Sequence, residues 1–408
     1  MTDLPLIVSL LLMLALAKML GEVFERMHQP AMVGEILAGI VLGSTFLGWI
    51  NYTSDINAIS DLAVLLLIIS AGLEIKVKDI LDSVQGKKIW IALLGFLIPF
   101  ISGIGLGVLF GFDSTVCVFL GLCISITALP VSVRILMDLG KLKTDVGGHV
   151  ISAAVFNDVL SLLVLGILLQ LGPGTYRHWS DLLINVGFML IKLAVFITVL
   201  LLSYKLLDHV TQFFSDTGKQ LSKHLDFLKG KGSDFALVMI FVLVFASLAE
   251  VIGLHFVVGA FFGAVLLPQP LISSKRMTSV AETTDTITMG FLAPIFFAAI
   301  GLEFNFSAIA NYGLLLAVFA VSFGSKILGG YTAGRIVGYS AGKSTTIGIG
   351  LNARGIIELV IAKIALANGL IDLSFFSILV IMGIVTTLVT PSLLGYGFKY
   401  LERRGEKC

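Results

Sequence analysis

An amide and a carboxylate lie side by side in the middle of an apolar stretch of the chain. Residues 152–166 read SAAVFNDVLSLLVLG, so Asn157 and Asp158 interrupt an otherwise apolar run. A charge at the centre of a lipid bilayer costs several kcal/mol and normally marks a functional site. A carboxylate there holds a partly dehydrated monovalent cation or a proton, but not both, and the amide adds an oxygen without a second acid. The pair predicts a site at which a cation and a proton compete.

Other polar residues are predicted at the same depth, near the centres of further apolar segments. Lys326 lies in VSFGSKILGG and is expected to be the counter-ion of Asp158 when no metal ion is bound. Thr127, in SITALPVS, is a candidate oxygen ligand. Intramembrane charges usually face a cavity and pair with one another. We therefore predict that Asp158, Asn157 and Thr127 bind the cation and the proton.

The segment IGLNARGIIELV adds an amide, a guanidinium and a carboxylate at this depth. Asn352, Arg354 and Glu358 lie around its centre. Arg354 and Glu358 are four residues apart, a spacing at which opposite charges on one helix form a stabilising pair. We predict that these three residues, together with Lys326, stabilise the core of the site.

Two of the segments are expected to break at mid-membrane. Pro130 removes a backbone donor and clashes with the preceding turn of a helix. Gly350 and Gly355 flank Asn352 and Arg354 and weaken helical structure there. Broken transmembrane helices expose carbonyl groups and half-helix ends to a bound ion. A mere kink, satisfied by neighbouring helices, is the alternative.

These residues must be positioned by membrane-spanning helices. About 20 apolar residues cross the hydrocarbon core of a bilayer, and long unbroken apolar runs favour helices over a barrel. We predict an all-α polytopic membrane protein of about thirteen transmembrane helices. The segments are 4–20, 31–48, 57–75, 88–110, 115–137, 147–171, 181–207, 234–252, 254–269, 286–305, 311–339, 344–367 and 374–398.

The composition agrees with a membrane protein and argues against several other classes. Of 408 residues, 57% are hydrophobic and 13% are charged, against about 25% charged residues in soluble domains. The net charge of +1 gives no reason to expect a nucleic-acid partner. The three cysteines suggest neither a disulfide framework nor a metal site. Without a nucleophile–base pair or a metal cluster, we expect no enzyme activity and no cofactor.

Lysine and arginine concentrate in alternate loops, and such a bias predicts the orientation in the membrane. We expect the N-terminus outside the cell, the C-terminus and the tail 401–408 in the cytoplasm, and the protein in the inner or plasma membrane. The basic loop residues are Lys76, Lys78, Lys87, Lys88, Lys141, Lys143, Lys219, Lys223, Lys229, Lys231, Lys275, Arg276, Lys343, Lys399, Arg403, Arg404 and Lys407.

The sequence also repeats itself. Residues 61–80 resemble 291–310, and GEILAGIVLG (34–43) resembles HFVVGAFFGAVLLP (255–268). Both matches correspond to a shift of seven predicted helices, and an odd shift inverts the orientation. Inverted repeats with a site at their interface are typical of secondary transporters. Within a transmembrane domain of 1–400 we predict a first repeat at 1–171, a linker helix and cytoplasmic loop at 181–233, and an inverted second repeat at 234–400.

Nearly the whole chain resembles the second cation:proton antiporter family of the monovalent cation:proton antiporter superfamily, with its sodium/hydrogen exchanger domain. The resemblance implies a thirteen-helix homodimer in which a core moves like an elevator against a dimerisation domain. Two broken helices would cross beside the ion-binding aspartate, which matches Asp158, and a family lysine matches Lys326. The matching motifs are GEILAGIVLG, ISAGLEI, SITALPVSVRILMDLGKLKT, AAVFNDVLSLLVLG, PIFFAAIGLEF, GLNARGIIELVIAKIALANGLI and VTTLVTP.

The chain departs from electrogenic members of this family, which carry two adjacent aspartates where Asn157 and Asp158 stand here. One acid fewer suggests exchange of one proton per cation. We therefore predict an electroneutral antiporter of Na⁺ or K⁺ against H⁺ with one site per protomer, serving pH homeostasis. The alternatives are a sodium-coupled organic anion symporter, with Arg354 binding the anion, and the membrane domain of a regulated K⁺ efflux system.

Four further acids lie toward the ends of predicted helices: Glu35, Glu74, Glu250 and Glu303. Such positions favour structural or interfacial roles over ion binding. We expect none of the four in the central site.

Overall fold

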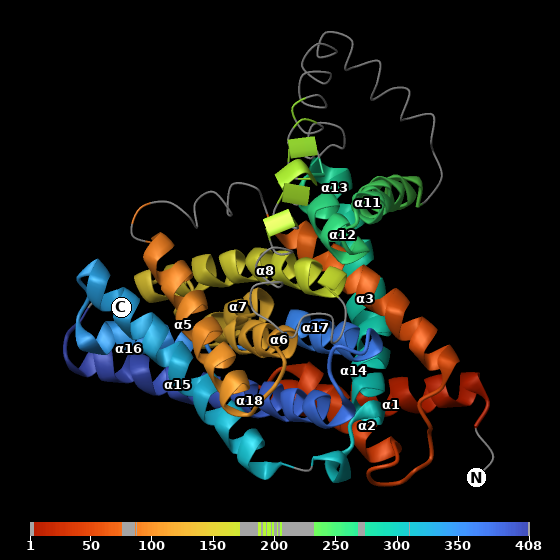
Figure 1. Cartoon of the computed structure of the whole chain (residues 1–408), viewed down its shortest axis with the longest axis horizontal. Coiled ribbons are helices and arrows are strands. Elements are labelled where there is room, and N and C mark those ends of the chain that lie inside the picture. Colours follow the sequence, from red (N-terminus) through yellow and green to blue (C-terminus); the bar gives the residue numbers. More distant parts are fainter. Residues whose placement is uncertain are drawn as a thin grey trace. The chain divides into compact units, whose positions relative to one another are not determined.

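The computed structural model describes the regular elements of the chain as helices (Figure 1). It describes residues 4–75, 86, 88–171, 187–188, 191–192, 194–196, 198–199, 202, 205, 232–267, 274–309 and 311–406. No strand occurs among these residues. The all-helical fold class predicted from the apolar segments is therefore confirmed.

The described helices differ widely in length, and those on either side of the two gaps near Asp158 are short. In chain order they are α1 (Leu6–Arg26), α2 (Ala31–Leu42), α3 (Ser54–Glu74), α5 (Lys88–Leu109), α6 (Ser114–Ser125), α7 (Leu129–Asp138), α8 (Asp145–Leu171), α11 (Ser233–Ile252), α12 (Phe256–Val265), α13 (Ser274–Ile287), the π-helical turn η1 (Thr288–Leu292), α14 (Ala293–Glu303), the 3₁₀ turn η2 (Phe306–Ala308), α15 (Tyr312–Val337), α16 (Ala341–Gly350), α17 (Ile356–Ala367) and α18 (Leu373–Arg403).

Among the described residues, nine helical runs are long and apolar enough to cross a membrane: Leu6–Arg26, Ser54–Glu74, Ile89–Leu109, Ser114–Asp138, Asp145–Leu169, Ser233–Ile252, Arg276–Glu303, Tyr312–Val337 and Leu373–Arg403. The helices Ala31–Leu42 and Phe256–Val265 are apolar but shorter. Most of the predicted helix 181–207 lies outside the described residues. The count of thirteen and the inverted repeats remain predictions.

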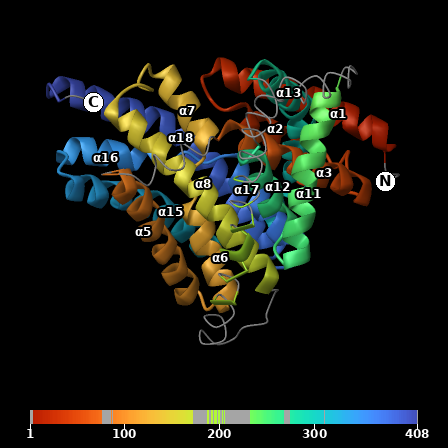
Figure 2. The same ribbon diagram turned by 90° about the horizontal axis from the view of Figure 1, so that it is seen from above.

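The chain divides into two compact units. One comprises residues 1–61, 78–182 and 294–408, and the other 62–77 and 183–293. Every polar residue singled out for the central site belongs to the first unit. In that unit, α8 lies against α6, α7, α16 and α17 (Figures 1 and 2).

Within the first unit, α2 and α14 approach so closely that their backbones nearly touch. A Cβ atom on Gly39 would lie 1.9 Å from the carbonyl oxygen of Ala298, and one on Gly301 would lie 2.1 Å from that of Ile36. Small residues permit this kind of packing between membrane helices. Apolar side chains including Ala38 complete the contact and are fully buried.

We predict that Gly39→Ala destabilises the protein, because its methyl group overlaps a backbone atom that has no room to move. Overpacking of this kind costs about 1–3 kcal/mol. Gly105→Ala is the matched control, since no atom lies within 4 Å of its added Cβ. Thermal unfolding of the detergent-purified protein should show a lower midpoint for Gly39→Ala and no loss for Gly105→Ala. Equal midpoints for the two variants would contradict this account of the packing.

Candidate functional site

Two helices of the first unit are interrupted, and their interruptions touch. The chain leaves α6 at Ser125 and enters α7 at Leu129, with Ile126 and Ala128 extended between them. A second gap separates α16 from α17. The backbone amide of Ala128 donates to the carbonyl of Ala353 across the two gaps, at 2.9 Å. The gaps therefore form one crossing.

The three residues predicted to break these helices lie at the ends of the half-helices. Pro130 is in the first turn of α7, where its missing N–H has no partner to lose. It starts a helix rather than kinking one. Gly350 ends α16, and a Cβ there would lie 2.6 Å from the side chain of Val150. Gly355 precedes α17 with an extended backbone, and a Cβ there would lie 2.5 Å from Ala128. Both glycines are therefore needed for space.

Asp158 lies on α8 at the start of α7. Its side chain is 1% exposed, and the backbone N–H of Leu129 points to its Oδ2 at 3.4 Å. Leu129 is the first residue of α7. A helix N-terminus carries a partial positive charge, which favours a carboxylate beside it. The crossing thus receives an acid at one of its positive ends.

Asn157 is linked to Lys326 through the hydroxyl of Thr127. The Thr127 Oγ1 accepts from the amide nitrogen of Asn157 at 3.1 Å and from the ammonium of Lys326 at 2.6 Å. It donates its own proton to the carbonyl of Leu351 at 2.8 Å. All three side chains are fully buried. The structure therefore brings together three of the predicted site residues through one oxygen atom.

This hydroxyl also fixes the orientation of the amide. Because the Thr127 proton goes to Leu351, its oxygen has only lone pairs to offer, and Asn157 must turn its nitrogen toward it. The carbonyl oxygen of the amide then faces away. No residue that the structure describes donates a hydrogen bond to this buried Oδ1.

Two buried cations bind the last carbonyls of α6. Lys326 donates to the carbonyl of Ser125 and to that of Gly95, the latter at 3.3 Å. Arg354 donates to Cys123 and, at 2.7 Å, to Ile124. The end of a helix is partially negative and leaves its carbonyls without helical partners. Both cations therefore satisfy a helix end inside the membrane domain.

Arg354, in the gap before α17, and Glu358, in the first turn of α17, form the predicted ion pair. The Nη1 of Arg354 lies 3.6 Å from Oε2 of Glu358, and both side chains are buried. Arg354 also donates to the hydroxyl of Ser322 at 2.6 Å. Asn352 makes a local contact, from its Nδ2 to the carbonyl of Gly348 at 3.1 Å.

Ser322 was not among the predicted site residues. It lies four residues before Lys326 on α15. This spacing places Ser322 and Lys326 on the same face of the helix. It was the available signal that Ser322 reaches the crossing.

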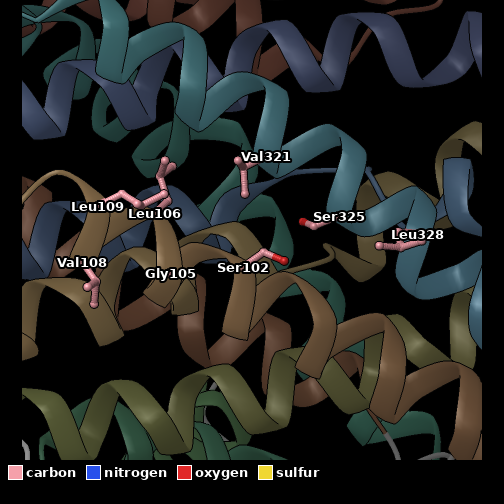
Figure 3. A pocket seen from close by; sticks show the side chains of 8 residues that line it. All are labelled: Ser102, Gly105, Leu106, Val108, Leu109, Val321, Ser325 and Leu328. Atoms are coloured by element: carbon pink, nitrogen blue, oxygen red, sulfur yellow. The ribbon is translucent and has the colours of Figure 1, made fainter.

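A cavity of 660 Å³ lies between α5 and α15 beside Ser325, the neighbour of Lys326 (Figure 3). Figure 3 shows Ser102 and Ser325 among aliphatic side chains. Its lining residues carry no charge, so this cavity offers no carboxylate to a cation. Asp158 remains the candidate acid.

We predict that Arg354→Met is strongly destabilising, because it leaves two α6 carbonyls and Glu358 without their partner. Removing one member of a buried ion pair costs about 3–5 kcal/mol. Ser322→Ala, which removes one hydrogen bond, should cost about 1 kcal/mol. Thermal unfolding in detergent compares the two. The interpretation fails if Arg354→Met is no less stable than Ser322→Ala.

Comparison with known proteins matches residues 7–397 to the family model described as "Sodium/hydrogen exchanger, transmembrane". The Na⁺/H⁺-K⁺ antiporter GerN of Bacillus cereus is 29% identical, over 95% of each chain. A Na⁺/H⁺ antiporter of Enterococcus hirae is 27% identical, over 95% of this chain and 97% of its own.

A solved structure shares the fold. The sodium proton antiporter MjNhaP1 of Methanocaldococcus jannaschii superposes with a TM-score of 0.70 over 96% of both chains, at 16% identity. The family match, which extends over most of the sequence, carries the assignment. The chain belongs to the transmembrane sodium/hydrogen exchanger family.

Proposed function

We propose that this protein exchanges Na⁺ or K⁺ for H⁺ across the inner or plasma membrane, with Asp158 as the shared binding group. The observation that carries the proposal is a buried carboxylate at the start of α7, adjacent in sequence to an amide whose oxygen accepts no hydrogen bond from the described residues. The relatives are described as antiporters of these ions. Asp158 and Asn157 would supply the oxygen ligands, and Thr127 would hold the amide in place.

A proton and a cation compete for Asp158 because each neutralises the same carboxylate. The buried charged groups of the crossing are Asp158, Glu358, Lys326 and Arg354, so their formal charges cancel when the site is empty. Loading either one proton or one monovalent cation changes the charge by the same amount. Exchange of one for one is then electroneutral, provided that Lys326 keeps its proton throughout.

Alternating access would follow the elevator mode that the family resemblance implies, in a homodimer with one site per protomer. The crossing supports this mode in one respect. Half-helices α6, α7, α16 and α17 are tied by side-chain and backbone hydrogen bonds, so they would move together with the bound ion. We retain the predicted orientation, with the N-terminus outside.

The symporter alternative is weakened by the contacts of Arg354. Both terminal nitrogens of this side chain donate to protein oxygens, at Cys123, Ile124 and Ser322. An organic anion would have to displace these partners. The antiporter therefore remains the function that the site supports best.

We predict that Asp158→Asn abolishes cation-driven proton movement, because the amide neither ionises nor exchanges a proton. Purified protein in liposomes with an internal pH dye would receive Na⁺, K⁺ or Li⁺ outside. Wild type should move protons with at least one cation, and the variant with none. Ser161→Ala on the same helix, whose hydroxyl donates to the backbone carbonyl of Asp158, is the control. Full activity in Asp158→Asn would rule out this carboxylate as the carrier.

We also predict that Asn157→Asp makes transport depend on the membrane potential, because a second acid can carry a second proton per cation. The rate of wild type should not change when the potential is clamped at different values with K⁺ and valinomycin, using Na⁺ as substrate. Asn157→Gln keeps the charge and serves as the control. A potential-dependent wild type would show that the exchange is not one for one.

A further inference from the structure

A second buried ion pair lies away from the Asp158 crossing, on the far part of α17. Lys363 is 3% exposed. Its ammonium donates to Oε1 of Glu303, at the end of α14, at 2.7 Å, and to the hydroxyl of Tyr52 at 2.5 Å. It also lies 4.3 Å from the centre of the Tyr52 ring. One cation thus joins α17, α14 and the loop before α3.

A pocket of 240 Å³ opens beside this pair. Its oxygen-bearing lining residues are Ser44, Asn51, Tyr52, Glu303 and Asn305. A water molecule takes about 30 Å³ in the liquid, so a partly hydrated alkali cation fits. The other carboxylate oxygen of Glu303, Oε2, is buried and accepts no hydrogen bond from any residue in the described part of the chain. An acid with a spare oxygen therefore lines this pocket.

The charge around the pocket favours a cation. Tyr52 donates to Asn57 at 2.8 Å, and Asn57 donates to the carboxylate of Asp61 at 3.1 Å. These contacts join one ammonium, that of Lys363, to two carboxylates, those of Glu303 and Asp61. The pKa of Tyr52 is raised, mainly because the phenol is buried and also because the negative charge of Glu303 is nearby. The phenol therefore stays neutral and remains a hydrogen-bond donor. The local formal charge is negative.

We propose that this pocket is a second binding site for a monovalent alkali cation, separate from Asp158. The carboxylate of Glu303 is its charged ligand, amide and hydroxyl oxygens of the lining complete the shell, and Lys363 competes with the ion. Occupancy does not require transport at Asp158. The site can therefore be tested in a protein whose central acid has been removed.

The competition gives two substitutions opposite effects. Glu303→Gln keeps the shape of the side chain but removes the negative charge, so cation binding should be lost. Lys363→Met removes the ammonium that repels the ion, so binding should tighten by about tenfold or more. Lys363→Arg keeps the positive charge and is the matched control. A purely structural ion pair would not produce opposite changes in cation affinity.

The experiment uses the full chain with Asp158→Asn, purified in detergent at pH 8.5. Its unfolding midpoint is titrated with NaCl and KCl against N-methyl-D-glucamine chloride at constant ionic strength, because a ligand that binds the folded state raises the midpoint. We expect saturable stabilisation by Na⁺ or K⁺ that Glu303→Gln abolishes, that Lys363→Met shifts to lower concentration and that Lys363→Arg leaves in place.

Two results would overturn the proposal: the Asp158→Asn protein gains no more stability from alkali cations than from the organic cation, or Lys363→Met leaves the titration unchanged. Both of these titrations can be measured even if Glu303→Gln fails to fold. Transport is scored separately, in the liposome assay with the wild-type protein. Failure of the antiporter proposal there would leave this binding result intact, and the reverse also holds.

Discussion

The end of α6 is the constraint on which the central site depends. The last four carbonyls of a helix have no partners within it, and here they lie in the interior of a membrane domain where water does not replace them. The hydroxyl of Ser125 donates to the carbonyl of Leu122. Arg354 donates to the carbonyls of Cys123 and Ile124, and Lys326 donates to that of Ser125. Four side-chain hydrogen bonds thus make it possible to end a helix at this depth.

The other broken ends follow the same electrostatic logic with the sign reversed. The positive start of α7 faces Asp158, and Glu358 lies in the first turn of α17. Each acid is beside a helix N-terminus and each base is at a helix C-terminus, the arrangement that helix dipoles favour. The buried charges therefore stabilise the broken helix ends and also supply the charged groups of the proposed ion site.

Much of this arrangement could be predicted from the sequence. The distances of Asp158, Lys326 and Arg354 from the ends of their apolar segments predict that all three lie at the same depth in the membrane. Membrane thickness fixes where the middle of each helix lies. The individual bonds could not be predicted this way. Which carbonyl a lysine reaches depends on how α15 is rotated and packed against α5 and α6, and hydropathy carries no information on rotation.

Glu303 and Lys363 illustrate the same limit. The position of Glu303 near a helix end was clear from the sequence, and an interfacial role was the natural expectation. Its partner is 60 residues away along the chain, and Lys363 lies inside an apolar run where nothing local indicates a polar neighbour. Pairs of this kind arise only when three separate segments are brought together.

The hydroxyl of Thr127 has one further consequence. One atom connects the side chain next to the acid on α8, the ammonium on α15 and the backbone between α16 and α17. Any movement of Asn157 that breaks its bond to Thr127 removes one of the three hydrogen bonds on this oxygen, which also carries the bonds to Lys326 and Leu351. In the proposed exchange, a change at Asn157 on cation binding would therefore reach α15 and the backbone between α16 and α17 through a single oxygen atom.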